Sequence, residues 1–427
     1  MNNISSDTPK WITDDQLHVW HPYTQMFTAP TPIPIKSAEG VYFHTVDGRQ
    51  ILDGISSWWV NIHGHSHPRL NQALRTQANK LSQIIFAGFT HEPAARLAAQ
   101  LVERTPRNLT KVFFSDDGST AVEVALKMSC QYWHNRGQSQ RNLFVSLKRA
   151  YHGDTFGAMS VGNVSEFHSR FSNLLFEVQR VSQSLSSIEK LLEKEGKRVA
   201  ALIIEPVVQA AGGMIIWPSE FLRHLRKITH QYNIPLIADE VFTGFGRTGK
   251  MFACSHGPIE PDLMCLSKGL TAGYLPLAVT LASEEIYEGF LSKDRSETFF
   301  HGHSFTGNAL SCAVALESLD LFDENNCLHR ISQLEMLFKT RLDSIANLPQ
   351  VKETRGIGAL AVIELQPREK GGYFDTSGAQ LTEAFLQRDI LLRPLGNVLY
   401  FLPPYVITDQ EVNRVFDTIE EVLDSKI

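Results

Sequence analysis

The sequence contains few cysteines, and their placement limits the cross-links and metal sites open to the chain. The five cysteines among 427 residues are Cys130, Cys254, Cys265, Cys312 and Cys327. Their number is odd, they are widely scattered, and no two have the C-x-x-C spacing, so the pattern indicates neither a disulfide framework nor a zinc site. A reducing, cytoplasmic location is therefore expected.

The sequence also lacks a long apolar run, a basic excess and an internal repeat. No stretch approaches the ~18 apolar residues of a membrane-spanning helix. Residues 1–11 are polar and show no apolar segment of a secretory signal. The formal net charge of −6 offers no basic surface to nucleic acid or to an anionic membrane. We expect neither among the partners.

What is present is the composition of a globular protein with a core, with 43% hydrophobic and 20% charged residues. From about residue 68, helical segments alternate with short, continuously apolar segments. Such strands are typical of an α/β fold whose mainly parallel central sheet has helices on both faces. Long helices are expected over 306–322 and 328–346. The expected strands are 112–114, 143–145, 201–204, 235–238, 263–266 and 277–280.

The two ends of the chain differ from this central part. The proline-rich segment 29–34 cannot be helical and predicts an extended arm. Asp47-Gly48 between apolar runs predicts a hairpin. We predict an N-terminal arm and hairpin (1–65) that belong to a small domain, a large domain (66–325) and a C-terminal part of the small α+β domain (326–427).

A lysine and an aspartate each end an apolar strand of the central part. Lys268 follows 263–266, and Asp239 follows 235–238. In an open α/β sheet ligands bind at the carboxyl ends of the strands, so both side chains are expected at one crevice. A lysine amine that bonds an aldehyde, with a carboxylate that keeps a pyridine nitrogen protonated, suits pyridoxal 5'-phosphate (PLP). Taken alone, such a lysine more commonly lies on the surface.

A third strand end offers a phosphate site. Residues 112–114 lead through Gly118 and Ser119 into a helix, whose N-terminus has free N–H groups and partial positive charge. Asp116 and Asp117 argue against this interpretation, because carboxylates repel phosphate. Helix capping is an equally good role for this segment.

Two more strands end in groups that suit the same crevice. Tyr151 follows 143–145, and an aromatic ring at this edge can stack on a flat cofactor, although such rings are more often core residues. Glu205 follows 201–204. Five such strand ends together are much less expected by chance than any single one.

Several longer stretches give the chain a resemblance to one family. These stretches are 20–26 (Trp-His-Pro-Tyr-Thr-Gln-Met), 56–60 with its tryptophan pair, 151–155, 205–214, 244–250 and 393–397. Over nearly its whole length the chain resembles the fold-type I PLP aminotransferases, in the subgroup that contains the ornithine and 4-aminobutyrate enzymes. The resemblance implies a PLP-dependent transaminase with a ping-pong mechanism.

The resemblance implies a role for each strand end. Lys268 would carry PLP covalently and move protons, Asp239 would pair with the ring nitrogen, and Tyr151 would stack on the ring; these are the implied catalytic residues. Gly118 and Ser119 would hold the phosphate.

The resemblance also implies a homodimer with shared active sites, because Gly302, His303 and Ser304 would reach the phosphate from the other subunit. The implied cofactor-binding residues are Gly118, Ser119, Tyr151, Asp239, Lys268, His303 and Ser304. The implied substrate-binding residues are Tyr23, Trp58, Trp59, Tyr151, Lys268, Gly302 and Arg393.

Within the subgroup the resemblance is strongest to the branch of biotin synthesis. It implies amino transfer to 8-amino-7-oxononanoate, giving 7,8-diaminononanoate, with S-adenosylmethionine as the implied donor. Trp58, Trp59 and Tyr23 would wall a pocket for the nine-carbon chain, and Arg393 would bind its carboxylate. Ala211 stands where the ornithine and 4-aminobutyrate enzymes carry glutamate, which counts against glutamate as the donor.

Several alternatives remain open. Lysine is the donor in some members of the branch. The same fold also serves ω-amino acid transaminases, decarboxylases and aminomutases, and a fold alone never excludes a scaffold without activity. Asp117 and His303 depart from the family, which commonly has serine and proline there.

Two further features have less specific interpretations. His63, His65 and His67 alternate along one segment, but no cysteine or carboxylate cluster accompanies them, so we expect hydrogen-bonded loop residues and no metal site. Arg247 lies in a glycine-rich loop, where it would either contact substrate or form a structural ion pair.

Overall fold

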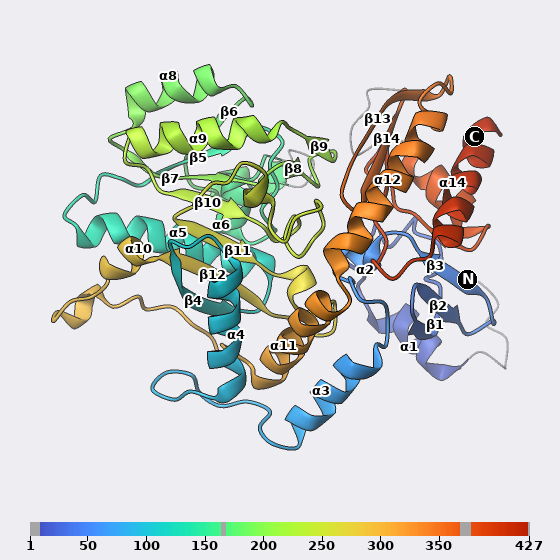
Figure 1. Cartoon of the computed structure of the whole chain (residues 1–427), viewed down its shortest axis with the longest axis horizontal. Coiled ribbons are helices and arrows are strands. Elements are labelled where there is room, and N and C mark those ends of the chain that lie inside the picture. The colour runs from blue at the N-terminus through green and yellow to red at the C-terminus, as the bar shows by residue number, and fades with distance from the viewer. Residues whose placement is uncertain (1–8, 164–167, 368–376, 426–427) are drawn as a thin grey trace.

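A seven-stranded sheet forms the centre of the computed structural model, which describes residues 9–163, 168–367 and 377–425 (Figure 1). The strand order is β4-β12-β11-β10-β7-β5-β6. The predicted mainly parallel sheet is confirmed, since only the pairs that involve β12 are antiparallel. The strands are β4 (Leu109–Ser115), β5 (Leu143–Leu147), β6 (Val178–Val181), β7 (Val199–Ile204), β10 (Leu236–Asp239), β11 (Leu263–Leu266) and β12 (Ala278–Ser283).

The direction of β12 differs from the parallel arrangement expected for the segment 277–280. The strand exists, but it runs antiparallel to both β11 and β4. A parallel return requires a crossover of about a dozen residues or more, usually with a helix. Here the connection is short and contains only the 3-10 turn η3 (Lys268–Thr271) and a loop, so the chain reverses.

Helices cover both faces of this sheet. In β10, Leu236 and Ala238 belong to the buried cluster on one face, and Ile237 belongs to the cluster on the other. This alternation explains why the strand is apolar throughout. One face packs against α5 (Gly118–Asn135), α6 (Phe156–Val161) and α10 (Glu284–Glu288), and the other against α8 (Leu185–Glu195) and α9 (Ser219–Gln231).

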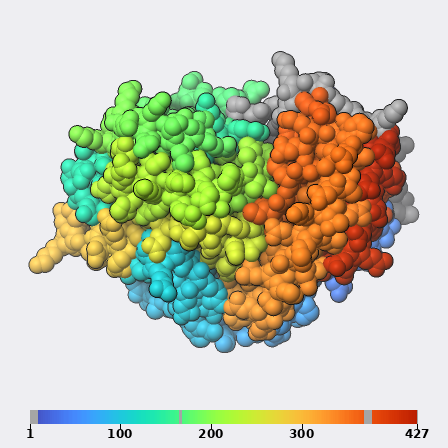
Figure 2. Space-filling view, turned by 45° about the horizontal axis from the view of Figure 1, so that its top comes forward, coloured from blue at the N-terminus to red at the C-terminus, as the bar shows by residue number. Residues whose placement is uncertain are grey.

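Both ends of the described chain lie on one side of the molecule (Figure 1). The predicted hairpin is present, and β15 of the C-terminal part extends its sheet by pairing parallel to β3. Figure 2 shows the C-terminal residues, orange to red, gathered beside the green and yellow middle of the chain. The elements here are α1 (Lys10–His18), β1 (Ile35–Glu39), β2 (Tyr42–Thr45), β3 (Gln50–Asp53), β13 (Val351–Ile357), β14 (Leu360–Leu365), α13 (Ser377–Leu386), β15 (Ile390–Leu391), β16 (Val398–Phe401) and α14 (Asp409–Asp424).

Two long helices precede β4 along the chain, and two more follow β12, before β13. The helix expected over 306–322 begins later, because the Asn308 side chain accepts hydrogen bonds from the N–H groups of Leu310 and Ser311 and so caps it. Pro68 occupies the first turn of its helix, as expected. These helices are α3 (Pro68–Ala78), α4 (Glu92–Arg104), α11 (Ala309–Glu324) and α12 (Cys327–Ile345).

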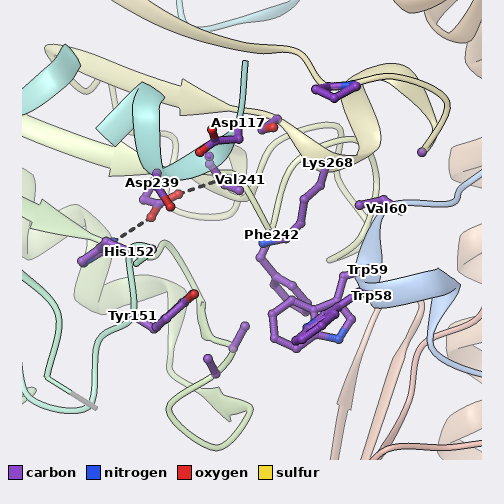
Figure 3. Close-up of a pocket in the computed structure, with 18 of the residues that line it drawn as sticks. Trp58, Trp59, Val60, Asp117, Tyr151, His152, Asp239, Val241, Phe242 and Lys268 are labelled. Atoms are coloured by element: carbon purple, nitrogen blue, oxygen red, sulfur yellow. Dashed lines mark hydrogen bonds and ion pairs between the residues drawn. The ribbon is translucent and has the colours of Figure 1, made fainter. Parts of the chain in front are cut away.

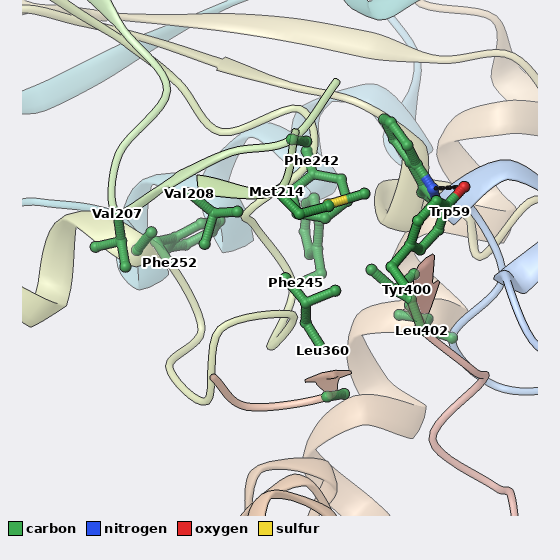
Figure 4. Packing of buried hydrophobic residues seen from close by; sticks show 14 of the residues in the cluster. Trp59, Val207, Val208, Met214, Phe242, Phe245, Phe252, Leu360, Tyr400 and Leu402 are labelled. Atoms are coloured by element: carbon green, nitrogen blue, oxygen red, sulfur yellow. Dashed lines mark hydrogen bonds between the residues drawn. The ribbon is translucent and has the colours of Figure 1, made fainter. Parts of the chain in front are cut away.

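Large apolar side chains fill the space where the central sheet meets the C-terminal strands (Figure 4). Phe242 and Phe245 from the loop after β10 join Leu360 of β14 and Tyr400 of β16. Full burial of such a side chain contributes about 1.5–3 kcal/mol, so this contact fixes the position of the C-terminal strands.

No described helix combines the length and the apolar character that crossing a membrane requires. The predictions for residues 1–8 and for the end of the C-terminal helix at residue 426 lie outside the described residues.

Candidate active site

A cavity of about 560 Å³ opens at the carboxyl ends of the sheet strands (Figure 3). Strands β4, β5, β7, β10 and β11 each bring their following residues to it, so the structure places all five predicted strand ends at one crevice. The predicted site residues that line it are Tyr23, Trp58, Trp59, Gly118, Ser119, Tyr151, Asp239, Lys268 and Arg393.

Lys268 projects into this cavity from the turn that follows β11. Its Nζ lies 5.1 Å from the centroid of the Trp59 indole ring. Desolvation lowers the pKa of the Lys268 amine, while the charges of Asp239 and Glu205 act in the opposite direction. A lowered pKa increases the fraction of neutral amine, which is the nucleophilic form.

Asp239 ends β10 and is held from two sides. Its Oδ2 lies 2.7 Å from Nδ1 of His152, and its Oδ1 accepts a hydrogen bond of 3.1 Å from the N–H of Val241 (Figure 3). Both side chains are buried. His152 is a site residue that the sequence interpretation missed. The available signal was its place directly after Tyr151.

Glu205 is a second buried carboxylate beside the lysine; the sequence placed its strand end at this crevice but gave the residue no role. It accepts hydrogen bonds of 2.9 Å from the N–H groups of Tyr151 and Ala210. It therefore joins the loop after β5 to the loop after β7. Burial raises the pKa of the Glu205 carboxyl to about 7.

The start of α5 provides a cradle for an anion. Asp117 is the N-cap: its side chain accepts from the N–H of Thr120, whose hydroxyl returns a hydrogen bond to the Asp117 backbone. The helix-capping role considered for this segment is therefore confirmed for Asp117. The first-turn N–H groups of Gly118 and Ser119 have no helical partner. A Cβ on Gly118 would lie 2.6 Å from Cγ1 of Val241, so the backbone can pass here only without a side chain.

Three side-chain oxygen atoms, from Tyr23, Tyr151 and Asp154, lie close together. The Tyr151 hydroxyl donates to Oδ2 of Asp154 at 3.0 Å and lies 3.2 Å from the Tyr23 hydroxyl, which also bonds to Asp154. Burial, and then the neighbouring Tyr23 and Asp154, raise the pKa of the Tyr151 phenol. Tyr151 therefore acts as a neutral ring.

The tryptophan pair lies on an unusual turn. Ser56, Ser57, Trp58 and Trp59 all have left-handed φ values, of 51°, 53°, 87° and 74°. This conformation costs about 1–2 kcal/mol per residue for side chains with a Cβ. The turn presents both indoles to the cavity, opposite Tyr151 (Figure 3).

Arg393 reaches the cavity from the loop between β15 and β16. Its guanidinium carbon lies 4.8 Å from the centroid of the Trp58 ring. Within residues 9–163, 168–367 and 377–425, Arg393 forms no ion pair with a carboxylate. A guanidinium has a planar fork of donors that matches a carboxylate.

Known proteins resemble the chain over nearly its whole length. The family model for class-III aminotransferases matches residues 23–423. The chain belongs to the class-III aminotransferases. It is 46% identical to the adenosylmethionine-8-amino-7-oxononanoate aminotransferase of Synechococcus elongatus, over 95% of this chain and 98% of that protein. The same comparison with the Aquifex aeolicus enzyme of that name gives 40% identity, over 96% of each chain.

Solved structures agree with this family assignment. The adenosylmethionine-8-amino-7-oxononanoate aminotransferase of Methanocaldococcus jannaschii superposes with a TM-score of 0.94 at 38% identity, covering 97% of this chain and 99% of that one. A PLP-bound amine transaminase from an uncultivated Pseudomonas species superposes with a TM-score of 0.88 at 30% identity. The superposition covers 94% of this chain and 97% of that one. The fold is that of the fold-type I PLP transaminases, as predicted.

This class-III aminotransferase depends on PLP, and its cavity residues fit that cofactor. A lysine amine of lowered pKa suits an aldehyde, and a buried carboxylate backed by an imidazole suits a pyridinium nitrogen. The free N–H groups at the start of α5 suit a phosphate. The three features lie around a single cavity.

The predicted phosphate residues Gly302, His303 and Ser304 do not line the cavity of their own chain. His303 instead lies beside the rim, with Nδ1 3.4 Å from Oδ2 of Asp116. Burial raises the pKa of the Asp116 carboxyl. The assignment of these three residues to another subunit's site stays a prediction.

Neither of the roles considered for Arg247 is seen among the described residues. The Arg247 side chain is buried and does not line the cavity. It donates hydrogen bonds to the carbonyl oxygens of Pro403 at 3.1 Å and Asn61 at 3.5 Å. His63 and His65 are hydrogen-bonded, to the Ser318 carbonyl and the Asp53 carboxylate respectively, at 2.9 Å each. Burial lowers the pKa of His63 to about 4.

Proposed function

We propose that this aminotransferase transfers an amino group from S-adenosylmethionine to 8-amino-7-oxononanoate, giving 7,8-diaminononanoate in biotin synthesis. The observation that carries the proposal is the 46% identity, over 95% of the chain, to an enzyme with that name. The shape of the cavity supports it. Tyr23, Trp58 and Trp59 form an aromatic wall of the cavity, and Arg393 lies beside it. This arrangement suits a long apolar chain that ends in a carboxylate.

In this proposal the strand ends bind PLP. When bound, PLP supplies an aldehyde carbon and a ring that stabilises negative charge on a substrate carbon. Lys268 would hold the cofactor through its Nζ, and the same amine, once the substrate's amine has replaced it, would take up and return the proton that moves during transfer. Asp239 keeps the ring nitrogen protonated, and Tyr151 covers one face of the ring. The first turn of α5 holds the phosphate through Gly118 and Ser119.

The aromatic wall binds the amino-keto acid. Trp58 and Trp59 cover its chain, and the Tyr23 hydroxyl is placed by Asp154 to contact a polar group of the ligand. Arg393 binds the carboxylate with two parallel hydrogen bonds, which a lysine cannot reproduce.

The proposal includes a homodimer in which Gly302, His303 and Ser304 complete the partner subunit's phosphate site. The loop that carries them is tied to the segment 82–91, since Gln83 donates to the Ser304 carbonyl at 2.7 Å. Together these segments expose large apolar side chains, and such a patch supports an interface. Its exposed members are Ile85, Phe89, Phe300 and Phe305.

One residue that lines the cavity bears on the choice of amino donor. Ala211 lines it at the position where a glutamate would mask an arginine in the ornithine and 4-aminobutyrate enzymes. This favours S-adenosylmethionine over glutamate and leaves lysine as the second candidate. A decarboxylase or aminomutase has no observation in its favour here.

We also propose the division into 1–65, 66–325 and 326–427, with the first and last parts forming one small domain. The parallel pairing of β3 with β15 supports it. The five unpaired cysteines support a reducing, cytoplasmic location.

The experiment is a half-reaction assay of the purified PLP-loaded enzyme. S-adenosylmethionine, lysine and glutamate are added separately, and conversion to the pyridoxamine form is followed by absorbance. 8-Amino-7-oxononanoate is then added, and 7,8-diaminononanoate is measured by mass spectrometry. We expect both changes with S-adenosylmethionine. Absence of 7,8-diaminononanoate with all three donors, or release of carbon dioxide, would contradict the proposal.

A further inference from the structure

Asp53, the last residue of β3, is fully buried, and its carboxylate accepts four hydrogen bonds. Oδ1 accepts from the N–H groups of Ile55 at 3.2 Å and Ser57 at 2.9 Å. Oδ2 accepts from the Ser57 hydroxyl at 3.0 Å and from Nε2 of His65 at 2.9 Å. Three of the four donors thus belong to the residues that begin the turn carrying the tryptophan pair.

Asn61 determines which ring nitrogen of His65 carries the proton. The Asn61 carboxamide oxygen accepts from the N–H of Gly64 at 2.7 Å, so its nitrogen faces Nδ1 of His65, 3.1 Å away. Nδ1 therefore accepts, and the ring proton resides on Nε2, where it is donated to Asp53. The contacts form one directed chain from Asn61 through His65 to the carboxylate.

The turn needs such support because nothing in its sequence favours its shape. Four successive residues with a Cβ adopt left-handed φ values, and none is glycine. Strained backbone of this kind persists only where its surroundings determine it. Ser56 adds one restraint, since its hydroxyl donates to the Leu402 carbonyl at 2.8 Å.

This turn sets the positions of the Trp58 and Trp59 rings at the cavity. Trp58 packs edge-on to Tyr23, with ring centroids 5.3 Å apart, and Trp59 donates from Nε1 to the Tyr400 hydroxyl at 3.1 Å. Neither Asp53 nor His65 lines the cavity.

We propose that Asp53, backed by His65, is a positioning residue for substrate recognition: it holds the left-handed turn 56–59 and so sets where Trp58 and Trp59 meet the substrate. The inference rests on the proposed function, in which the tryptophan pair walls the amino-keto acid. It goes beyond that function by assigning specificity to a carboxylate that does not touch the ligand.

The first test is Asp53→Asn in the full-length, PLP-loaded enzyme. The amide nitrogen meets the N–H of His65, donor against donor, so the hydrogen bond from His65 is lost. We expect kcat/KM to fall ~10–100-fold, mainly through a higher KM for 8-amino-7-oxononanoate, while bound PLP keeps its absorption. Asp47→Asn, at the exposed end of the same hairpin, is the matched control and should match the wild type.

The second test separates positioning from general stability. Glycine adopts left-handed φ without the steric cost, so adding Ser57→Gly to Asp53→Asn should restore kcat/KM about 5-fold. A merely stabilising role for Asp53 predicts a lower Tm with KM unchanged, and that result would overturn the proposal.

A third measurement needs neither substrate nor cofactor. The fluorescence of Trp58 in the cofactor-free protein is obtained by subtracting the spectrum of the same chain with Trp58→Phe. We expect it to shift to longer wavelength in Asp53→Asn and to return toward the wild-type position with Ser57→Gly. If Asp53→Asn does not fold, His65→Ala carries the same three readouts, with smaller effects expected.

An unchanged KM together with unchanged Trp58 emission, in whichever of these variants folds, overturns the inference. Failure of the wild-type enzyme to use 8-amino-7-oxononanoate contradicts the proposed function alone, because the fluorescence measurement still tests the turn.

Discussion

Nδ1 of His152 lies 2.7 Å from a carboxylate oxygen of Asp239, and both side chains are buried. Nε2 of His152 has no hydrogen-bond partner among the described residues, so the imidazole's polar contact is directed at this carboxylate. The imidazole therefore holds Asp239 in one orientation at the place proposed for the pyridinium nitrogen.

Removing this imidazole should weaken PLP binding. In His152→Ala the buried carboxylate loses a charge-assisted hydrogen bond, so we expect the Kd for PLP to rise ~10–100-fold. Asn at this position can still donate to Asp239, and His152→Asn should recover part of the loss. Titration of the cofactor-free protein with PLP measures both, and equal losses in the two variants would show that the hydrogen bond is not the cause.

Glu205 should give the cofactor-free protein a pH-dependent stability. Its pKa is raised from 4.5 to about 7 in the folded state, so the folded protein binds the proton more tightly than the unfolded chain. This stabilisation is complete below pH 4.5 and is lost as the pH rises through about 7. The change amounts to about 3 kcal/mol.

Urea unfolding of the wild type and of Glu205→Gln across this range measures the effect. The stability advantage of the wild type over the variant should shrink as the pH rises from 4.5 to 7. The exposed Glu193→Gln is the control, and it should show no such trend. A constant difference between the wild type and Glu205→Gln would refute the assignment.

Arg393 should discriminate the carboxylate of the amino-keto acid. In Arg393→Ala the KM for 8-amino-7-oxononanoate should rise ~10–100-fold, because a charged hydrogen-bond partner is lost. The methyl ester of the same substrate lacks the charge, and the variant and the wild type should use it equally well. If Arg393→Ala raises the KM for the ester as much as the KM for the acid, Arg393 supports the site without contacting the carboxylate.

Lys268→Ala should remove the covalent attachment of PLP and the visible absorption that this attachment produces. Turnover should fall ~100- to 10,000-fold, the usual range for a group that transfers protons. Lys339→Ala, an exposed position on α12, serves as the control for loss of a lysine. Unchanged colour and turnover in Lys268→Ala would contradict the role given to this residue.

Subunit mixing tests the shared active site. Ser304→Asp places a negative charge at the proposed phosphate site of the partner subunit, so this variant and Lys268→Ala should each be inactive. After equimolar unfolding and refolding together, half of the dimers are mixed, and each has one intact site. About a quarter of the wild-type activity should therefore return. If Ser304 serves its own subunit's site, no activity returns.

The strand ends were predictable because they follow from local rules. A short apolar strand between helices must be buried on both faces, and the carboxyl ends of parallel strands share one edge. Asp239 and Lys268 could therefore be assigned to one crevice from their positions at the end of β10 and just after β11. The direction of β12 was not predictable from its apolar pattern, because that pattern is the same for a parallel and an antiparallel strand.

The sequence by itself determined the α/β fold, the meeting of Lys268 and Asp239 at one crevice, and the family. It did so because periodicity, strand ends and motifs are local properties of the chain. Only the tertiary structure revealed that His152 holds Asp239, that Glu205 joins two loops, and that Asp53 supports the turn of Trp58 and Trp59. These contacts depend on long-range packing and on left-handed backbone angles that no local pattern in the chain encodes.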